Sequence, residues 1–310
     1  MPSEFELIRK YFARPATSAL LGAGDDAALL RPRPGMELAV STDLLLEGTH
    51  FRAGDEPRKL GHKALAVNLS DMAAMGAAPR WALLAISLPA ADETWLAAFA
   101  AGLFALAGRF GVELIGGDTT RGPRSICITI LGDVPAGQAL RRAGAAPGDD
   151  VWVSGELGGA ALALARPGCA GAAKRLHEPE PRVALGQRLR GLASAAIDVS
   201  DGFAQDLGHL LESSGVGAVV QYDLVPKFSA FKKLEDKKFE AQCVLSGGDD
   251  YELVFTAPQR VRAGIEAVSK ELDLALSRVG TIQQGESKLL IIDQERKPIA
   301  VARGFDHFAT

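Results

Sequence analysis

The sequence predicts a protein of mixed α/β and α+β class that is divided into two domains. Its 310 residues are enough for two hydrophobic cores. Short apolar runs typical of strands alternate with longer segments of helical periodicity, as in folds that pack helices against sheets. A stretch rich in Gly, Ala, Pro and Arg, residues 135–150, interrupts this alternation. We therefore expect an N-terminal domain of residues 1–137 and a C-terminal domain of residues 138–310.

The elements expected in the N-terminal domain are helices at 4–13, at 57–75 and between Asp92 and Gly111, and strands at 37–42, 81–88, 112–115 and 125–134. Pro57 suits the first turn of its helix, and the apolar residues that follow recur at helical spacing. Asp92 is a good N-cap for the next helix, and Gly111 is a good residue to end it. The Trp95, Phe99 and Leu103 side chains lie on one stripe of this helix and are expected in the core.

In the C-terminal domain we expect strands at 151–154, 217–221, 252–256 and 289–292, and helices at 158–164, 182–192 and 203–213. Lysine becomes more frequent after residue 221. We interpret the Lys-rich segment 227–240 as a solvated helical surface without a functional role.

Composition excludes several classes of protein. Lys and Arg number 34 against 38 Asp and Glu, a balance that argues against a nucleic-acid binder, which needs a basic surface. No apolar run reaches the roughly 18 residues of a membrane span, and the first residues do not resemble a signal peptide. The three cysteines are scattered, as is usual for idle thiols in a reducing compartment. We therefore expect a cytoplasmic enzyme with small-molecule substrates.

A series of acidic residues follows apolar runs or lies in glycine-rich turns. Its members are Asp25, Asp26, Asp43, Asp71, Asp118, Asp198, Asp201, Asp249 and Asp250. Any one of these could be structural, since Asp and Gly favour turns for conformational reasons. Several carboxylates that converge at the edge of a hydrophobic layer would repel one another unless cations were bound.

The residue types in this series indicate Mg²⁺. The neighbouring hydroxyls of Ser41, Thr42 and Ser200 add hard oxygen donors, and no His/Cys cluster accompanies them. Because Mg²⁺ usually shares its coordination shell with substrate phosphates, a polyphosphate substrate is implied. The sequence has no P-loop motif and no protein-kinase motifs. The segment Gly22–Ala27 fits a dinucleotide-binding pattern only formally, because two carboxylates stand where a pyrophosphate would bind.

Seven segments carry a family resemblance: GAGDDAALL (22–30), STDLLLEGTHF (41–51), KALAVNLSDMAAMGAAPRWALLAISLP (63–89), LIGGDTTRGP (114–123), IDVSDGFAQDLGHL (197–210), SGGDDYELVFT (246–256) and GFDHFAT (304–310). In this order they resemble the thiamine-monophosphate kinase family, in the superfamily of aminoimidazole ribonucleotide synthetase. The resemblance implies an N-terminal α+β sheet domain that dimerises through its sheet, and a C-terminal α/β domain that completes the active site. It also implies direct in-line transfer of phosphate from ATP to thiamine monophosphate, assisted by several Mg²⁺ ions, in a homodimer.

Carried over position by position, the resemblance assigns the site residues. The implied Mg²⁺ ligands are Asp26, Ser41, Thr42, Asp43, Asp71, Asp118 and Asp198, with Asp201 as a further metal contact. The implied ATP contacts are Gly117, Asp118, Arg142 and Ser200. His50 would hold the phosphate of thiamine monophosphate, and Asp249 and Phe305 would border the thiamine ring. The family usually has Glu where this chain has Asp249, which could alter the grip on the ring. No residue is expected to act as a general base.

Two alternatives remain open at this point. One is another ATP-using synthetase of the superfamily. A selenophosphate synthetase would need a reactive cysteine near the N-terminus, and the first cysteine here is Cys127. The other is a non-catalytic regulator that binds nucleotide or metal on the same scaffold. Such a regulator would be expected to lack ligands, whereas every acidic position of the pattern is occupied.

Overall fold

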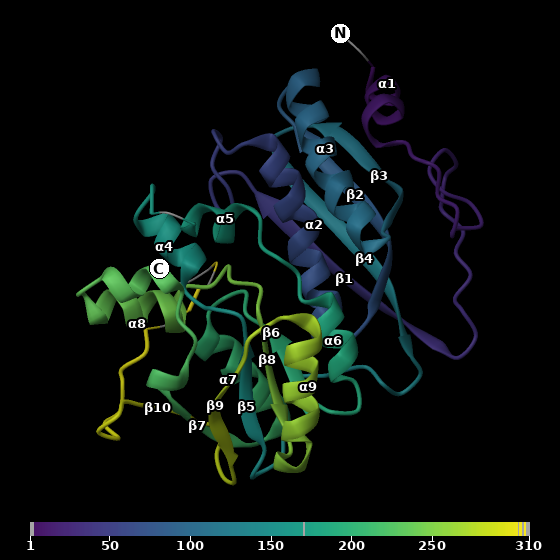
Figure 1. The fold of residues 1–310 in the computed structure, drawn as a ribbon. Helices are drawn as coiled ribbons and strands as arrows, with labels where there is room; N and C mark the ends of the chain where they lie inside the picture. The colour runs from purple at the N-terminus through teal and green to yellow at the C-terminus, as the bar shows by residue number, and fades with distance from the viewer. Residues whose placement is uncertain (1–2, 170, 303, 306, 308–310) are drawn as a thin grey trace. The chain divides into compact units, whose positions relative to one another are not determined.

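The chain forms two compact units in a computed structural model that describes residues 3–169, 171–302, 304–305 and 307 (Figure 1). Unit 1 comprises Met1–Met72 and Ala77–Gly137, and unit 2 comprises Ala73–Gly76 and Gln138–Thr310. Within the described residues, no helix is long and apolar enough to cross a membrane.

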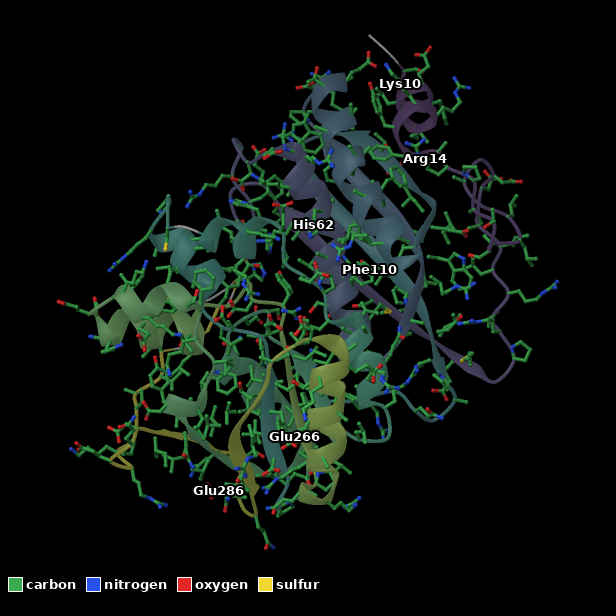
Figure 2. All side chains as sticks on the ribbon, viewed as in Figure 1. Lys10, Arg14, His62, Phe110, Glu266 and Glu286 are labelled. Carbon is green, nitrogen blue, oxygen red and sulfur yellow. The ribbon has the colours of Figure 1, made fainter. Side chains whose placement is uncertain are left out.

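Unit 1 is built on a four-stranded sheet with helices against one face (Figure 1). Its strands are β1 (Met36–Leu46), β2 (Ala78–Leu88), β3 (Glu113–Arg121) and β4 (Ser125–Pro135), in the spatial order β1-β4-β2-β3. Strand β4 pairs antiparallel with β1 and β2, and β2 pairs parallel with β3. The helices are α2 (Pro57–Ala74) and α3 (Glu93–Phe110), preceded by α1 (Glu4–Leu7) and the π-helix η1 (Ile8–Phe12). Lys10, labelled in Figure 2, pairs with Glu93 and attaches η1 to α3.

Helix α3 begins and ends where its sequence signals predict. The Asp92 carboxylate accepts a hydrogen bond of 3.0 Å from the Trp95 amide, and Gly111 ends the helix in the left-handed conformation at φ 65°. Phe99 and Leu103 are buried. Trp95 is half-buried and stacks on Phe99 with ring centroids 5.1 Å apart. The stripe predicted for the core is therefore confirmed, with Trp95 at its margin.

Helices α2 and α3 touch through glycines. A Cβ atom on Gly61 would lie 2.1 Å from the Phe99 carbonyl oxygen, and one on Gly102 would lie 1.8 Å from the Arg58 carbonyl oxygen. No side chain fits at either position, so the two backbones can approach only because both residues are glycine.

Gly102→Ala is expected to lower the free energy of unfolding by about 1–3 kcal/mol or more, because the added methyl group meets backbone that must move. Gly108→Ala is the matched control on the same helix: Gly108 is exposed and a Cβ there would meet nothing within 4 Å. This second change is expected to stabilise the protein by about 0.5–1 kcal/mol, because alanine restricts the unfolded chain. Denaturant unfolding of both variants measures the difference. Equal effects would contradict the close helix contact.

The two faces of the sheet in unit 1 differ in burial. Ala39 and Leu45 of β1 are buried. The alternate positions on the other side of β1 are apolar but exposed: Leu38, Val40, Leu44 and Leu46. We call the side of the sheet that carries these four residues the outer face. The expected strand at 37–42 is too short, because β1 continues to Leu46.

Unit 2 is built on a six-stranded mixed sheet in the order β10-β7-β9-β5-β8-β6. The strands are β5 (Asp150–Ser154), β6 (Ala195–Asp198), β7 (Gly217–Gln221), β8 (Leu253–Ala257), β9 (Leu276–Gln283) and β10 (Leu289–Ile292). The helices are α4 (Gly159–Ala165), α5 (Ala172–His177), α6 (Val183–Leu189), α7 (Phe203–Ser214), α8 (Lys237–Ser246) and α9 (Arg262–Leu272), with short 3₁₀ turns η2 (Tyr222–Leu224), η3 (Ser229–Lys233) and η4 (Gln259–Val261). Val151 and Val153 of β5 belong to the main core, and the intervening Trp152 stacks on Phe255 with centroids 6.2 Å apart.

The sequence did not predict α5, β6, α8, α9 or β9. The expectation of a wholly solvated surface at 227–240 is also wrong. Phe228 and Phe231 are buried in the core of unit 2, and the Glu240 carboxylate accepts a hydrogen bond of 3.2 Å from the buried Tyr222 hydroxyl. The high lysine content of this segment suggested a solvated surface, although Phe228 and Phe231 pack in the core.

Candidate functional site

In unit 1, two of the predicted metal ligands are in direct contact. Ser41 and Asp43 lie on the same side of β1 as the buried Ala39 and Leu45. The Ser41 hydroxyl donates a hydrogen bond of 2.5 Å to the Asp71 carboxylate of α2. Asp43 is two residues further along the same side of β1 and is half-buried. Hydroxyl and carboxylate oxygens therefore gather between this strand and α2.

Two other predicted ligands lie on the outer face. The Thr42 hydroxyl contacts the Thr129 hydroxyl at 3.0 Å and the Cys127 sulfur at 3.5 Å. Asp118 of β3 pairs with Ala85, which pairs with Cys127, which pairs with Leu44. Residues that pair directly point to the same side of a sheet, so Asp118 is on the outer face with Thr42.

Asp43 and Asp118 are on opposite edge strands of the sheet, since the order is β1-β4-β2-β3. Three inter-strand spacings separate them, about 14 Å. Ligands of one Mg²⁺ lie within about 4 Å of each other, because each is about 2.1 Å from the ion. Asp43 and Asp118 of one chain are therefore too far apart to share an ion.

Gly117 packs directly against the backbone of β2. Its φ is +143°, and a Cβ atom would be 1.8 Å from the Leu84 carbonyl oxygen. The position therefore requires glycine.

The remaining candidates of unit 1 are at its surface. Asp26 is exposed, and its amide donates to the Asp25 carboxylate at 2.9 Å. His50 follows β1, and its Nδ1 accepts a hydrogen bond of 3.0 Å from the Leu46 amide. This bond fixes the ring and makes Nε2 the nitrogen that carries the proton in the neutral form.

In unit 2, the predicted ligands Asp198, Ser200 and Asp201 lie at the end of β6 and in the loop before α7. Asp198 is buried, and Ser200 and Asp201 are half-buried. The loop is closed by Asp206 of α7, a residue that the sequence analysis did not single out. Burial, and next the charge of Asp201, raise the pKa of Asp206 to about 7, although three backbone amides act in the opposite direction.

A strained turn lies beside this loop. Gly248, Asp249 and Tyr251 all have positive φ, at 66°, 60° and 51°. The Tyr251 hydroxyl donates a hydrogen bond of 2.9 Å to the Asp249 carboxylate. Such backbone persists in non-glycine residues only where the surroundings enforce it, and it concentrates at functional sites.

Two buried acids next in the chain, Asp250 and Glu252, fix the turn by hydrogen bonds. Both carboxylate oxygens of Asp250 accept from the Gly158 amide, at 3.0 and 2.8 Å, and burial raises the pKa of Asp250 to about 8. Glu252 accepts from Arg182 and, at 2.6 Å, from the Ser154 hydroxyl. The role of Glu252 was not predicted, although an acid directly before a buried apolar strand indicates a buried ion pair or hydrogen bond.

Phe305 and Arg142 also belong to unit 2. Phe305 is exposed, and its amide donates to the Asp201 carbonyl oxygen at 3.0 Å. Arg142 is exposed as well, and its carbonyl oxygen accepts from the Ser214 hydroxyl at 3.0 Å. Unit 2 thus brings together Ser200, Asp201, Asp249 and Phe305. Among the residues that the structure describes, no three His, Cys, Asp or Glu side chains are close enough to one another to hold a metal ion.

The chain matches two protein families along most of its length. Residues 24–134 match the family described as AIR synthase related protein, N-terminal domain, and residues 146–292 match its C-terminal counterpart. Curated relatives are similar over nearly the whole chain. The thiamine-monophosphate kinase of Salmonella typhimurium (strain LT2) is 44% identical over 99% of this chain and 98% of its own length. The Bacillus subtilis (strain 168) enzyme is 32% identical over 98% of this chain and 99% of its own length.

Solved structures agree with this assignment. The crystal structure of thiamine-monophosphate kinase from Stenotrophomonas maltophilia K279a is 47% identical, with a TM-score of 0.84 over 89% of this chain and 91% of that chain. A structure described as AaThiL complexed with AMPPCP and TMP is 28% identical, with a TM-score of 0.78 over 90% of this chain and 89% of that chain. The hydrogenase maturation protein HypE in complex with ATP shares the fold, with a TM-score of 0.79 at 21% identity. By full-length similarity, this chain belongs to the thiamine-monophosphate kinase family, within the AIR synthase-related superfamily.

Proposed function

We propose that this protein transfers the γ-phosphoryl group of ATP to thiamine monophosphate and forms thiamine diphosphate and ADP. The observation that carries the proposal is the similarity to thiamine-monophosphate kinases over 99% of the chain. A relative of similar fold is described as complexed with AMPPCP, a non-hydrolysable ATP analogue, and with TMP. The acidic pattern of this chain supports the same chemistry.

The donor set fits Mg²⁺. Aspartate and hydroxyl oxygens are the hard ligands that this ion prefers, and the contact of Ser41 with Asp71 places two such donors together. The residues proposed to hold the ions are Asp26, Ser41, Thr42, Asp43, Asp71, Asp118, Asp198 and Asp201. Mg²⁺, when bound, would neutralise charge on the phosphate oxygens.

The substrates are proposed to bind by complementary groups. Gly117 is exposed, so a phosphate can approach its backbone, and Asp118, Arg142 and Ser200 are further proposed contacts of ATP. The fixed imidazole of His50 presents Nε2 to the phosphate of thiamine monophosphate. Asp249 and Phe305 suit the cationic and aromatic character of the thiazolium ring.

The reaction needs orientation more than proton transfer. The attacking group is an oxygen of a phosphate monoester, which is already anionic at neutral pH. Its oxygen forms a bond to the γ-phosphorus while the bond from that phosphorus to the β–γ bridging oxygen breaks, and ADP leaves. No general base is required, and no phosphoenzyme intermediate is proposed. The residues of the chain align the two phosphates and relieve their mutual repulsion.

We further propose that the enzyme is a homodimer in which the outer face of unit 1 is the interface. The four exposed apolar residues of β1 form a row, which is unusual on a free surface. Thr42 and Asp118 are on the same face. If two outer faces pack about a two-fold axis, Asp118 of a second copy can approach Thr42, which Asp118 of the same chain cannot reach.

The proposed activity is tested by incubating purified protein with ATP, Mg²⁺ and thiamine monophosphate. Thiamine diphosphate and ADP are expected in equal amounts, and chelation of the metal with EDTA should stop both. Selenide and aminoimidazole-pathway precursors serve as alternative acceptors. ADP formation without thiamine diphosphate would overturn the proposal.

A further inference from the structure

Three consecutive backbone amides converge on one oxygen atom. The Asp206 Oδ2 atom accepts hydrogen bonds from the amides of Ser200, Asp201 and Gly202, at 3.0, 3.1 and 3.1 Å. Asp206 lies in the first turn of α7, and only 3% of it is exposed. Amides that point to one carboxylate fix the orientation of every peptide plane in the segment. The orientation of the segment 200–202 is therefore fixed by one buried side chain.

The carbonyl groups of the same stretch face the opposite way and bind two other parts of unit 2. The Ser200 carbonyl oxygen accepts from the Asp249 amide at 2.8 Å. The Asp201 carbonyl oxygen accepts from the Phe305 amide at 3.0 Å. Asp249 and Phe305 are the two proposed contacts of the thiamine ring. Ser200 and Asp201 are proposed contacts of ATP and metal. One peptide segment thus joins the two half-sites.

The segment 200–202 packs closely against two neighbouring stretches of backbone. A Cβ atom on Gly248 would be 2.5 Å from the Ser200 carbonyl oxygen, and one on Gly202 would be 2.9 Å from the backbone of Ser246. Gln205, next to Asp206, donates to the Phe305 carbonyl oxygen at 3.0 Å. A change in the direction of the segment would therefore displace the strained turn at Asp249 and the Phe305 backbone together.

We propose that Asp206 is a positioning residue that couples the nucleotide and thiamine half-sites of unit 2 through the segment 200–202. The inference rests on the proposed function and adds to it a residue that touches neither substrate. The ionised Asp206 carboxylate attracts all three amides to its Oδ2 atom, because hydrogen bonds to a charged acceptor are roughly twice as strong as neutral ones. Loss of this charge would leave the three amides without a charged acceptor, and the contact that fixes the direction of the segment would be weaker.

The test measures each ligand separately in the full-length protein. Asp206→Asn keeps the shape of the side chain and removes its charge. Calorimetry with AMPPCP and Mg²⁺, and separately with thiamine monophosphate, is expected to show that both dissociation constants rise about tenfold. Two comparison variants each remove one direct contact: Ser200→Ala is expected to weaken only the nucleotide, and Phe305→Ala only thiamine monophosphate.

Asp149→Asn is the matched control for stability. Asp149 is also a buried carboxylate of unit 2, and it accepts from the Ala146 amide at 3.1 Å and the Ser194 hydroxyl at 2.6 Å, away from the segment 200–202. It should lower the melting temperature as much as Asp206→Asn does and leave both dissociation constants unchanged. If Asp206→Asn does not fold, Asp206→Glu keeps the charge but moves the oxygen, and it is expected to weaken both ligands.

Three results would overturn the inference. They are a change in only one of the two dissociation constants, no change in either, and equal losses in the Asp149→Asn control. A wild-type protein that binds neither ligand would instead reject the proposed function, so the two failures are distinguishable.

Discussion

Replacing Asp71 with asparagine is expected to lower the turnover of thiamine monophosphate roughly 100- to 1,000-fold while the protein stays folded. The Asp71 carboxylate receives the Ser41 hydroxyl at 2.5 Å, and Asp43 lies on the same side of β1. An amide keeps the size of the carboxylate and can still accept that hydroxyl, so the fold should not change. It loses the negative charge that makes a hard anionic ligand for Mg²⁺. The loss should therefore appear in turnover and in the Mg²⁺ concentration needed for half-maximal rate.

Asp92→Asn is a suitable control for this substitution. Asp92 is in the same unit but caps α3, and asparagine caps a helix about as well as aspartate does. Its turnover and unfolding midpoint should remain those of the wild type. Asp43→Asn should behave as Asp71→Asn does. Wild-type rates at saturating ATP and low Mg²⁺ in both variants would reject the metal assignment.

Local signals predicted the parts of the fold that carry strong caps or periodicity. Helix α3 has Asp92 before it and Gly111 after it, and its predicted extent agrees with the structure. Helix α9 was missed because only Ile265 and Val268 of its residues are buried, so its apolar stripe is short. Strand β9 was missed because Arg278 and Gly280 interrupt its apolar pattern. Strand β9 is stabilised by tertiary packing although its local pattern is weak.

The chemistry of the candidate site was predictable, but its geometry was not. Residue types alone indicated Mg²⁺ and a polyphosphate, because carboxylates recur beside apolar runs. Which acids are neighbours depends on the order of strands, and that order is set by non-local pairing that a single sequence does not reveal. Asp206 was missed for a related reason. Acidic residues are common in the first turn of helices because they interact favourably with the helix dipole. In the sequence, Asp206 therefore looks like any other acid at this position, and nothing indicates that it binds three amides.

Because of the order of strands, we expect a mixed dimer of two inactive variants to recover activity. Asp43 and Asp118 are on opposite edges of one sheet, so an active site that contains both would need Asp43 of one copy and Asp118 of the other. Each single variant, Asp43→Asn or Asp118→Asn, should be inactive as a homodimer because both of its sites lack one acid. A mixed dimer of the two variants has one site with both acids and one site with neither. It should therefore recover about half of the wild-type activity per dimer.

The mixed dimer can be isolated by co-expressing the two chains with different affinity tags and purifying over both. Its control is a mixed dimer of Asp43→Asn with Asp71→Asn. These acids are on β1 and on the helix that contacts β1 in the same chain, as the hydrogen bond from Ser41 to Asp71 indicates. Each site of this control lacks one acid, so it should remain inactive. If the Asp43/Asp118 pair were as inactive as this control, each site would draw both acids from one chain, and the proposed interface would have to be abandoned. Recovery in the first pair alone would mean that each active site takes residues from β1 of one copy and from β3 of the other.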